Sequence, residues 1–153
     1  MTKLQSGHIY LLANALWDSI ELKKIGVSND TQIRIKGLST ALPDEINKLF
    51  ESNILIDKYF YEHMVSKMLY KYRYSSNREF YKIDIEDFKK IITMVETINR
   101  LYNDEESLLE FIKNYDLEYY KRRFNRNSEY IKRDIINKVI KRKKQSLYVC
   151  TVE

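Results

Sequence analysis

The stretch "KKIGVSNDTQIR", Lys23 to Arg34, decides the fold because it runs from a strand through a turn into a helix. The alternating pattern of "ELKKIGV" predicts an extended segment over residues 21–27. The "SND" that follows supplies capping side chains, and "TQIRIKGL" predicts a short helix that stops at Gly37. Arg34 falls one turn into this helix, so it can point back toward Gly26, where the strand has no side chain.

A second strand is expected to pair with this one. "HIYLLAN", residues 8–14, alternates in the same way and sets Tyr10 on the face that Lys24 occupies. Helical periodicity predicts a helix over residues 58–73, which places Glu62 at the margin between its apolar stripe and its polar side. A phenol, an amine, a guanidinium and a carboxylate would therefore converge on one concave surface.

These four side chains, Tyr10, Lys24, Arg34 and Glu62, are the parts that phosphodiester hydrolysis needs. A tyrosine can take a proton from water only if nearby cations lower its pKa from about 10, and Lys24 and Arg34 are the cations at hand. An arginine that opposes the charge of the transition state is worth roughly 10² to 10³ in rate. The carboxylate of Glu62 is a suitable ligand for Mg²⁺, with waters and substrate phosphate completing the shell and Mn²⁺ as a substitute.

Several short motifs follow one another over about residues 6–85: "GHIYLL", "KKIG", an arginine eight residues after that glycine, a glutamate on a later helix, and "NREFY". As an ordered set they resemble a GIY-YIG endonuclease domain, of the compact branch common in phage and large DNA viruses. Gly7 and Gly26 match the glycines of the two motifs. The resemblance implies an α+β fold in which helices flank a small three-stranded antiparallel sheet. It also implies a divalent-metal-dependent hydrolase that cuts DNA.

The resemblance assigns a role to individual residues. Tyr10 matches the tyrosine proposed in the family as general base, Arg34 the catalytic arginine, and Glu62 the metal-binding glutamate. Lys24 departs from the family, because the second motif usually has tyrosine there; an ammonium at that position can lower the Tyr10 pKa or hold water and phosphate. This departure motivates an alternative, a catalytically weak or inactive nucleic-acid-binding or regulatory protein on the same scaffold.

Composition sets the class of protein. A chain of 153 residues with 44% hydrophobic content suits one folded domain, or one with an extension. No run of 18 apolar residues and no secretory signal is present, which predicts an intracellular protein without a membrane partner, in the cytoplasm or, in a eukaryotic host, in the nucleus or a viral replication site. The single cysteine, Cys150, is read as a free thiol.

Positive charge gathers toward the C-terminus. Residues 121–144 contain eleven Lys and Arg against two acidic residues, a charge of +9, whereas the rest of the chain carries −4. A basic segment on an acidic body indicates a polyanionic partner, here DNA, although a solvated lysine-rich helix is the alternative. The residues expected to contact DNA are Arg73, Arg78, Lys121, Arg122, Arg123, Arg126, Arg133, Lys141 and Lys144.

The remaining pattern predicts strands and helices in the N-terminal part of the chain and helices alone in the C-terminal part. We expect a nuclease-like domain over residues 6–103 and a basic helical extension over residues 104–153, packed on the first. The extension would begin with a helix capped at Asn103, and "SLYVCTVE", residues 146–153, is read as a strand that could join a second copy in a homodimer. The other expected elements are a strand within 45–55, a brief extended piece over 78–83, and helices over 85–102 and 128–144.

Overall fold

The computed structural model describes residues 4–69, 72–75, 79–115 and 128–152. Contacts divide the chain into two compact units, one from Gln5 to Glu96 and the other formed by the residues outside that range. The first unit contains an antiparallel sheet and the helices that contact it, which confirms the predicted α+β class. Among the described residues, no helix combines the length and the hydropathy needed to cross a bilayer.

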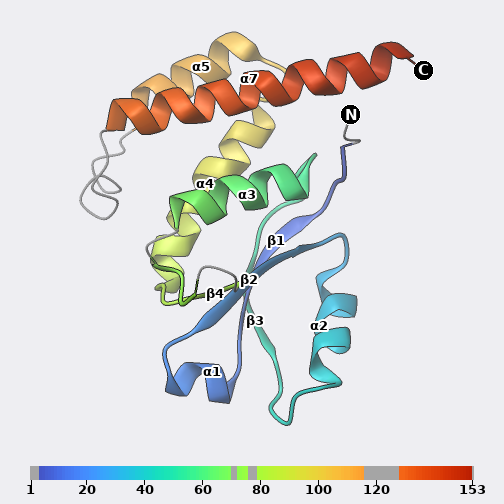
Figure 1. The fold of residues 1–153 in the computed structure, drawn as a ribbon, viewed down its shortest axis with the longest axis vertical. Coiled ribbons are helices and arrows are strands. Elements are labelled where there is room, and N and C mark those ends of the chain that lie inside the picture. The colour runs from blue at the N-terminus through green and yellow to red at the C-terminus, as the bar shows by residue number, and fades with distance from the viewer. Residues whose placement is uncertain (1–3, 70–71, 76–78, 116–127, 153) are drawn as a thin grey trace. The chain divides into compact units, whose positions relative to one another are not determined.

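The sheet has the strand order β3-β1-β2-β4, one strand more than predicted (Figure 1). The central pair, β1 and β2, aligns Tyr10 with Gly26 and Leu12 with Lys24, so Tyr10 and Lys24 lie on one face as expected. The added strand is a two-residue piece that pairs with Lys23 and Lys24. The strands are β1 (His8–Ala13), β2 (Lys23–Ser28), β3 (Asn47–Glu51) and β4 (Phe80–Tyr81).

Helices fill the connections of the first unit. A short helix, α1, occupies the link between β1 and β2, and its Trp17 is buried with its ring centre 5.1 Å from that of Phe80. Helix α2 contacts β2, and α3 contacts both β1 and β2 (Figure 1). The helices of this unit are α1 (Ala15–Ser19), α2 (Thr31–Ser39), α3 (Lys58–Met68) and α4 (Ile85–Arg100), of which α4 contains the boundary at Glu96.

The core of the first unit covers both faces of β1. Tyr10 and Leu12 pack with Trp17, Leu22 and Ile46 in one cluster. The alternate residues Ile9 and Leu11 are also fully buried, as are Phe88, Ile91, Ile92 and Val95 of α4. A strand buried on both faces holds its side chains in fixed positions, which makes β1 a rigid support for Tyr10.

The second unit contains two further helices, α5 (Glu105–Asn114) and α7 (Ser128–Val152). Leu108 and Ile112 of α5 are buried, as are Ile135 and Val139 of α7. The Lys132 ammonium of α7 donates to the Lys113 carbonyl of α5 at 2.6 Å. This unit is therefore built from helices with apolar inner faces, as the periodicity predicted.

Three local predictions need correction. The helix after β2 continues through Gly37, whose position faces open space, so this glycine does not end it. Asp104, rather than Asn103, caps α5 by accepting from the Ser107 N–H at 3.2 Å. Residues 146–152 belong to helix α7, which removes the basis for a strand-mediated dimer.

Candidate active site

A cavity of about 320 Å³ in the first unit collects polar side chains from several elements. The end of β2 and the residue after it, residues 27–29, form part of its wall. The side chains with chemistry to offer come from β1, α2, α3 and the residue before β4, and Gly26 of β2 lies among them. These residues are Tyr10, Gly26, Arg34, Lys58, Tyr59, Glu62 and Glu79.

Tyr10 crosses over Gly26 on the sheet. The two residues face each other in the β1–β2 register, and a Cβ atom at Gly26 would lie only 2.6 Å from Cζ of the phenol. Glycine is therefore required so that the Tyr10 ring, which is 1% exposed, can extend across β2 to the cavity. The space that the missing side chain of Gly26 leaves is therefore occupied by the Tyr10 phenol.

Arg34 reaches this phenol from α2. The Asp30 carboxylate accepts from the Ile33 N–H at 3.2 Å and caps α2, which begins the helix so that Arg34 lies one turn in. Interaction of the guanidinium with the Tyr10 hydroxyl raises the pKa of Arg34 above its ordinary value. The predicted approach of Arg34 to Tyr10 is thus present in the structure.

The pKa of Tyr10 moves in the direction opposite to the one expected. Burial raises it above its ordinary value of 10.0, because the phenolate loses solvation. The hydrogen bond and charge of Arg34 act to lower the pKa but do not outweigh burial, and the charges of Glu79 and Glu62 raise it further. The Tyr10 hydroxyl is therefore protonated at neutral pH and can donate its proton in a hydrogen bond.

Lys24 shares a sheet face with Tyr10, as predicted, but it is not among the residues that line the cavity. Its ammonium lies 2.5 Å from Oε2 of Glu79 and 5.2 Å from the centre of the Phe80 ring. The Ile25 N–H also donates to the Glu79 carbonyl at 3.0 Å, so the backbone of Glu79 is held against β2. Glu79 consequently presents a carboxylate to the cavity where the sequence had suggested an amine.

Glu62 provides a second carboxylate in the same cavity. Burial raises its pKa above the ordinary 4.5, the negative charge of Glu79 raises it further, and Lys24 acts in the opposite direction. The two carboxylates therefore repel each other across a partly buried space, which a divalent cation would relieve. Within the described residues, no group of three or more His, Cys, Asp or Glu side chains could hold a metal ion. Oxygen atoms of substrate and water would have to complete its shell, as Mg²⁺ commonly requires.

Two charged cavity residues were missed as functional candidates. Glu79 lies within "NREFY", where only Arg78 was expected to have a role. Lys58 was not considered, although it stands one helical turn before Glu62 on the same side of α3. Neither could be recognised from periodicity, because "NREFY" carried no pattern and Lys58 begins its helix.

The predicted DNA contacts are dispersed. The Arg73 guanidinium lies 6.0 Å from the Tyr81 ring, outside the cavity. Arg133, Lys141 and Lys144 are exposed on α7, as predicted for its outer face. The other candidates, Arg78, Lys121, Arg122, Arg123 and Arg126, lie outside the described residues.

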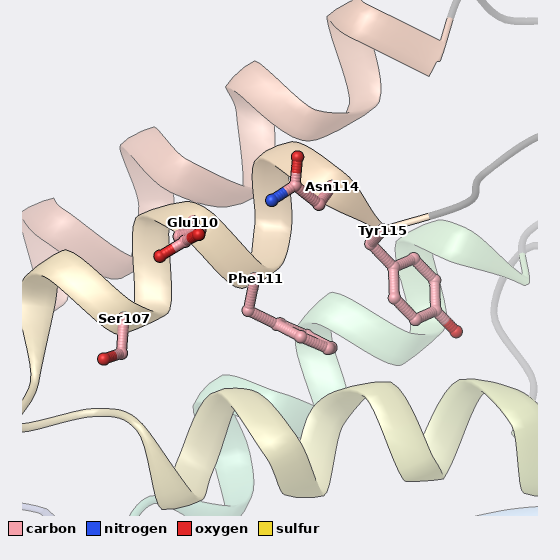
Figure 2. Close-up of a pocket in the computed structure, with 5 residues that line it drawn as sticks. All are labelled: Ser107, Glu110, Phe111, Asn114 and Tyr115. Carbon is pink, nitrogen blue, oxygen red and sulfur yellow. The ribbon is translucent and has the colours of Figure 1, made fainter.

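A larger cavity, of about 420 Å³, lies along α5 in the second unit. Figure 2 shows the Phe111 and Tyr115 side chains projecting from the same side of the helix, with ring centres 5.3 Å apart. Ser107, Glu110 and Asn114 complete its lining. This set contains one carboxylate and no cation, so it offers no counterpart to the Arg34–Tyr10 arrangement.

The cavity that contains Tyr10 and Arg34 lies within the part of the chain that matches a known protein family. A family model described as the T5orf172 domain matches residues 7–96. The chain belongs to this family. The T5orf172 match contains all seven chemically relevant cavity residues and ends where the first compact unit ends. The T5orf172 domain is associated with phage nuclease-type domains. No curated protein and no solved structure matches the chain significantly.

Proposed function

We propose that this T5orf172 protein is a divalent-metal-dependent DNA endonuclease of the GIY-YIG type. The observation that carries the proposal is the meeting of Tyr10, Arg34, Glu62 and Glu79 in one cavity, with Arg34 close enough to act on the pKa of Tyr10. A guanidinium, a phenol and two carboxylates from four parts of the fold are groups that can bind a phosphodiester and activate water. The family association and the order of motifs support the same reaction.

Glu62 is the residue that would hold the Mg²⁺ or Mn²⁺ ion. Its carboxylate is a hard oxygen ligand, and the nearby Glu79 charge increases the attraction of a cation to the cavity. The bound ion would supply charge stabilisation at the phosphate oxygens. Because only carboxylates of Glu62 and Glu79 are available there, metal affinity should rise when DNA contributes its phosphate oxygens.

The protein side chains divide the remaining work. Arg34 is placed to oppose negative charge on the phosphate, and the Tyr10 hydroxyl both orients Arg34 and can donate to a phosphate oxygen. In this scheme water adds to phosphorus, and the proton that it releases passes to the Glu79 carboxylate. One ester P–O bond breaks, and the departing oxygen takes a proton from a second water molecule to leave as an alcohol. Lys24 acts by holding Glu79 in position rather than by touching the substrate.

The basic surface of α7 would add non-specific affinity. Its exposed Arg133, Lys141 and Lys144 can contact backbone phosphates, which gives salt-dependent binding without sequence recognition. DNA is therefore the partner that we propose for the chain as a whole.

The test is cleavage of supercoiled, linear, branched and single-stranded DNA with Mg²⁺ or Mn²⁺. The proposal is supported if the native protein cleaves DNA and if Arg34→Ala and Glu62→Ala each lower the cleavage rate by about 10² or more. Intact DNA under every condition, or equal cleavage by these variants, would refute it.

A second candidate is a DNA-binding protein on this scaffold that does not cut. The protonated, buried Tyr10 and the engagement of Lys24 by Glu79 favour it, because neither side chain is then available as a base. Salt-sensitive DNA binding without cleavage under any metal would select this candidate.

A further inference from the structure

Lys58, the first residue of α3, is a lysine that the fold buries beside the reaction cavity. It is 8% exposed and lines the same cavity as Arg34 and Glu62. In the described part of the chain, its ammonium donates one hydrogen bond, to the Ser6 carbonyl at 3.2 Å, and lies 5.0 Å from the Tyr59 ring centre. An ammonium carries three donors, so Lys58 retains donor capacity toward the cavity.

The start of β1 fixes the position of Lys58. The Lys58 N–H donates to the Gln5 carbonyl at 2.8 Å, and Gly7 and Leu55 exchange two backbone hydrogen bonds of 3.0 and 2.7 Å. A Cβ atom at Gly7 would lie 2.5 Å from Cδ of Lys58 and 2.7 Å from the Ser28 carbonyl oxygen, so glycine lets the lysine stem and the β2 backbone both pack against this position.

The ammonium is not used to neutralise the nearest carboxylate on its own helix. Glu62 lies four residues after Lys58, the spacing at which helical ion pairs form, yet the described residues contain no ion pair between them. A buried lysine beside a polar cavity, directed to a carbonyl rather than a carboxylate, is available for an anion. Arg34 is the other cation of this cavity, and it comes from a different element.

We propose that Lys58 binds the DNA backbone in the cavity. Its ammonium contacts either a second phosphate or another oxygen of the phosphate that Arg34 contacts. This inference rests on the proposed function, since DNA is the ligand. Arg34 from α2 and Lys58 from α3 would then hold the strand from two elements, which fixes its register relative to Glu62. Lys58 is a substrate-binding residue in this scheme, and its contribution is made before the chemical step.

The experiment measures DNA binding without cleavage. The full chain is titrated into a fluorescein-labelled DNA duplex in EDTA, by fluorescence anisotropy at several salt concentrations. Lys58→Met keeps the stem beside Gly7 but removes the charge, and Lys67→Met makes the same change at an exposed position of the same helix, outside the cavity. We expect Lys58→Met to lose affinity about five- to tenfold and to reduce the slope of log K against log salt by about 1.

Further variants separate binding from folding. Lys58→Arg should restore most of the affinity, which a purely structural contact to Ser6 would not require. If Lys58→Met melts at a much lower temperature than the native chain, Lys58→Gln, which retains a donor for Ser6, replaces it in the same titration. Circular dichroism of each variant establishes that the compared proteins are folded.

The outcomes distinguish this inference from the proposed function. Native-like affinity and salt slope in the folded Lys58 variants would overturn the role of Lys58 while leaving the nuclease proposal standing. A native chain that fails to bind DNA at low salt would overturn both. Reduced binding by Lys58→Met, with no cleavage by the native chain under any metal, would support the role of Lys58 and reject the endonuclease.

Discussion

The Lys24 ammonium and the Glu79 carboxylate form an ion pair of 2.5 Å at the edge of the candidate active site. The lysine side chain is 11% exposed, whereas the glutamate side chain is 56% exposed and lines the cavity. The buried partner therefore fixes the more accessible one. Lys24 of the second motif therefore does not reach the cavity itself. It holds Glu79, and the Glu79 carboxylate is the group that reaches the cavity.

Exchange of Glu79 for glutamine should separate proton transfer from metal binding. We expect Glu79→Gln to lose about 10² or more in cleavage rate, because an amide cannot accept the proton released by water. Glu62→Gln should instead abolish Mn²⁺ binding, which calorimetry with DNA present measures.

In the same measurement, Glu79→Gln should retain most of the Mn²⁺ binding. Loss of Mn²⁺ binding in both variants would contradict the division of roles between Glu62 and Glu79. Glu86→Gln, at an exposed ion pair with Lys89, serves as the control and should keep both properties.

Two glycine substitutions should have opposite effects on stability. Gly26→Ala places a Cβ against the Tyr10 ring and should destabilise the protein by about 1–3 kcal/mol through overpacking. Gly37→Ala lies in helix α2 with open space around it and should stabilise the protein by about 0.5–1 kcal/mol. Urea denaturation of the two variants and the native chain measures both changes. Equal effects at the two sites would contradict the packing of Tyr10 over Gly26.

The pH dependence of stability should report the burial of Glu62. Because its pKa is raised on folding, the folded state binds this proton more tightly than the unfolded state does. The stabilisation is fully present below the ordinary pKa of 4.5 and is lost as pH rises through the raised value. Without metal, Glu62→Gln should therefore be at least as stable as the native chain at pH 7, and its advantage should shrink toward pH 4. Melting temperatures across this range provide the measurement, and an advantage that grows toward low pH would contradict it.

The exposed basic stripe of α7 should supply non-specific affinity. Replacement of Arg133, Lys141 and Lys144 by glutamine should weaken binding of unrelated DNA duplexes to a similar extent and reduce the salt slope by about 3. Lys132 and Lys138 are the matched controls, because their ammonium groups already bind the Lys113 carbonyl and the Asp134 carboxylate. Their double glutamine variant should change the salt slope less, and an equal change would remove the stripe as a distinct DNA surface.

Patterns within a few residues predicted the elements of the fold. Alternation located β1 and β2, and helical periodicity located α3, α4 and α5. Errors arose at helix boundaries, because a single residue determines where a helix begins or ends. Gly37 lies inside α2 and does not end it, and Asp104 caps α5 in place of Asn103.

The sequence by itself determined which residues approach Tyr10 through local geometry. The β1–β2 register opposes Tyr10 to Gly26, and the capped start of α2 brings Arg34 to the phenol; both depend on short-range rules of strand pairing and helix initiation. Only the tertiary structure decided the charges of the cavity. Lys24 and Glu79 are separated by 55 residues, and Ser6 and Lys58 by 52, so their contacts depend on how distant segments pack. Burial, which raises the Tyr10 pKa against the pull of Arg34, is likewise a property of the whole core that no local pattern contains.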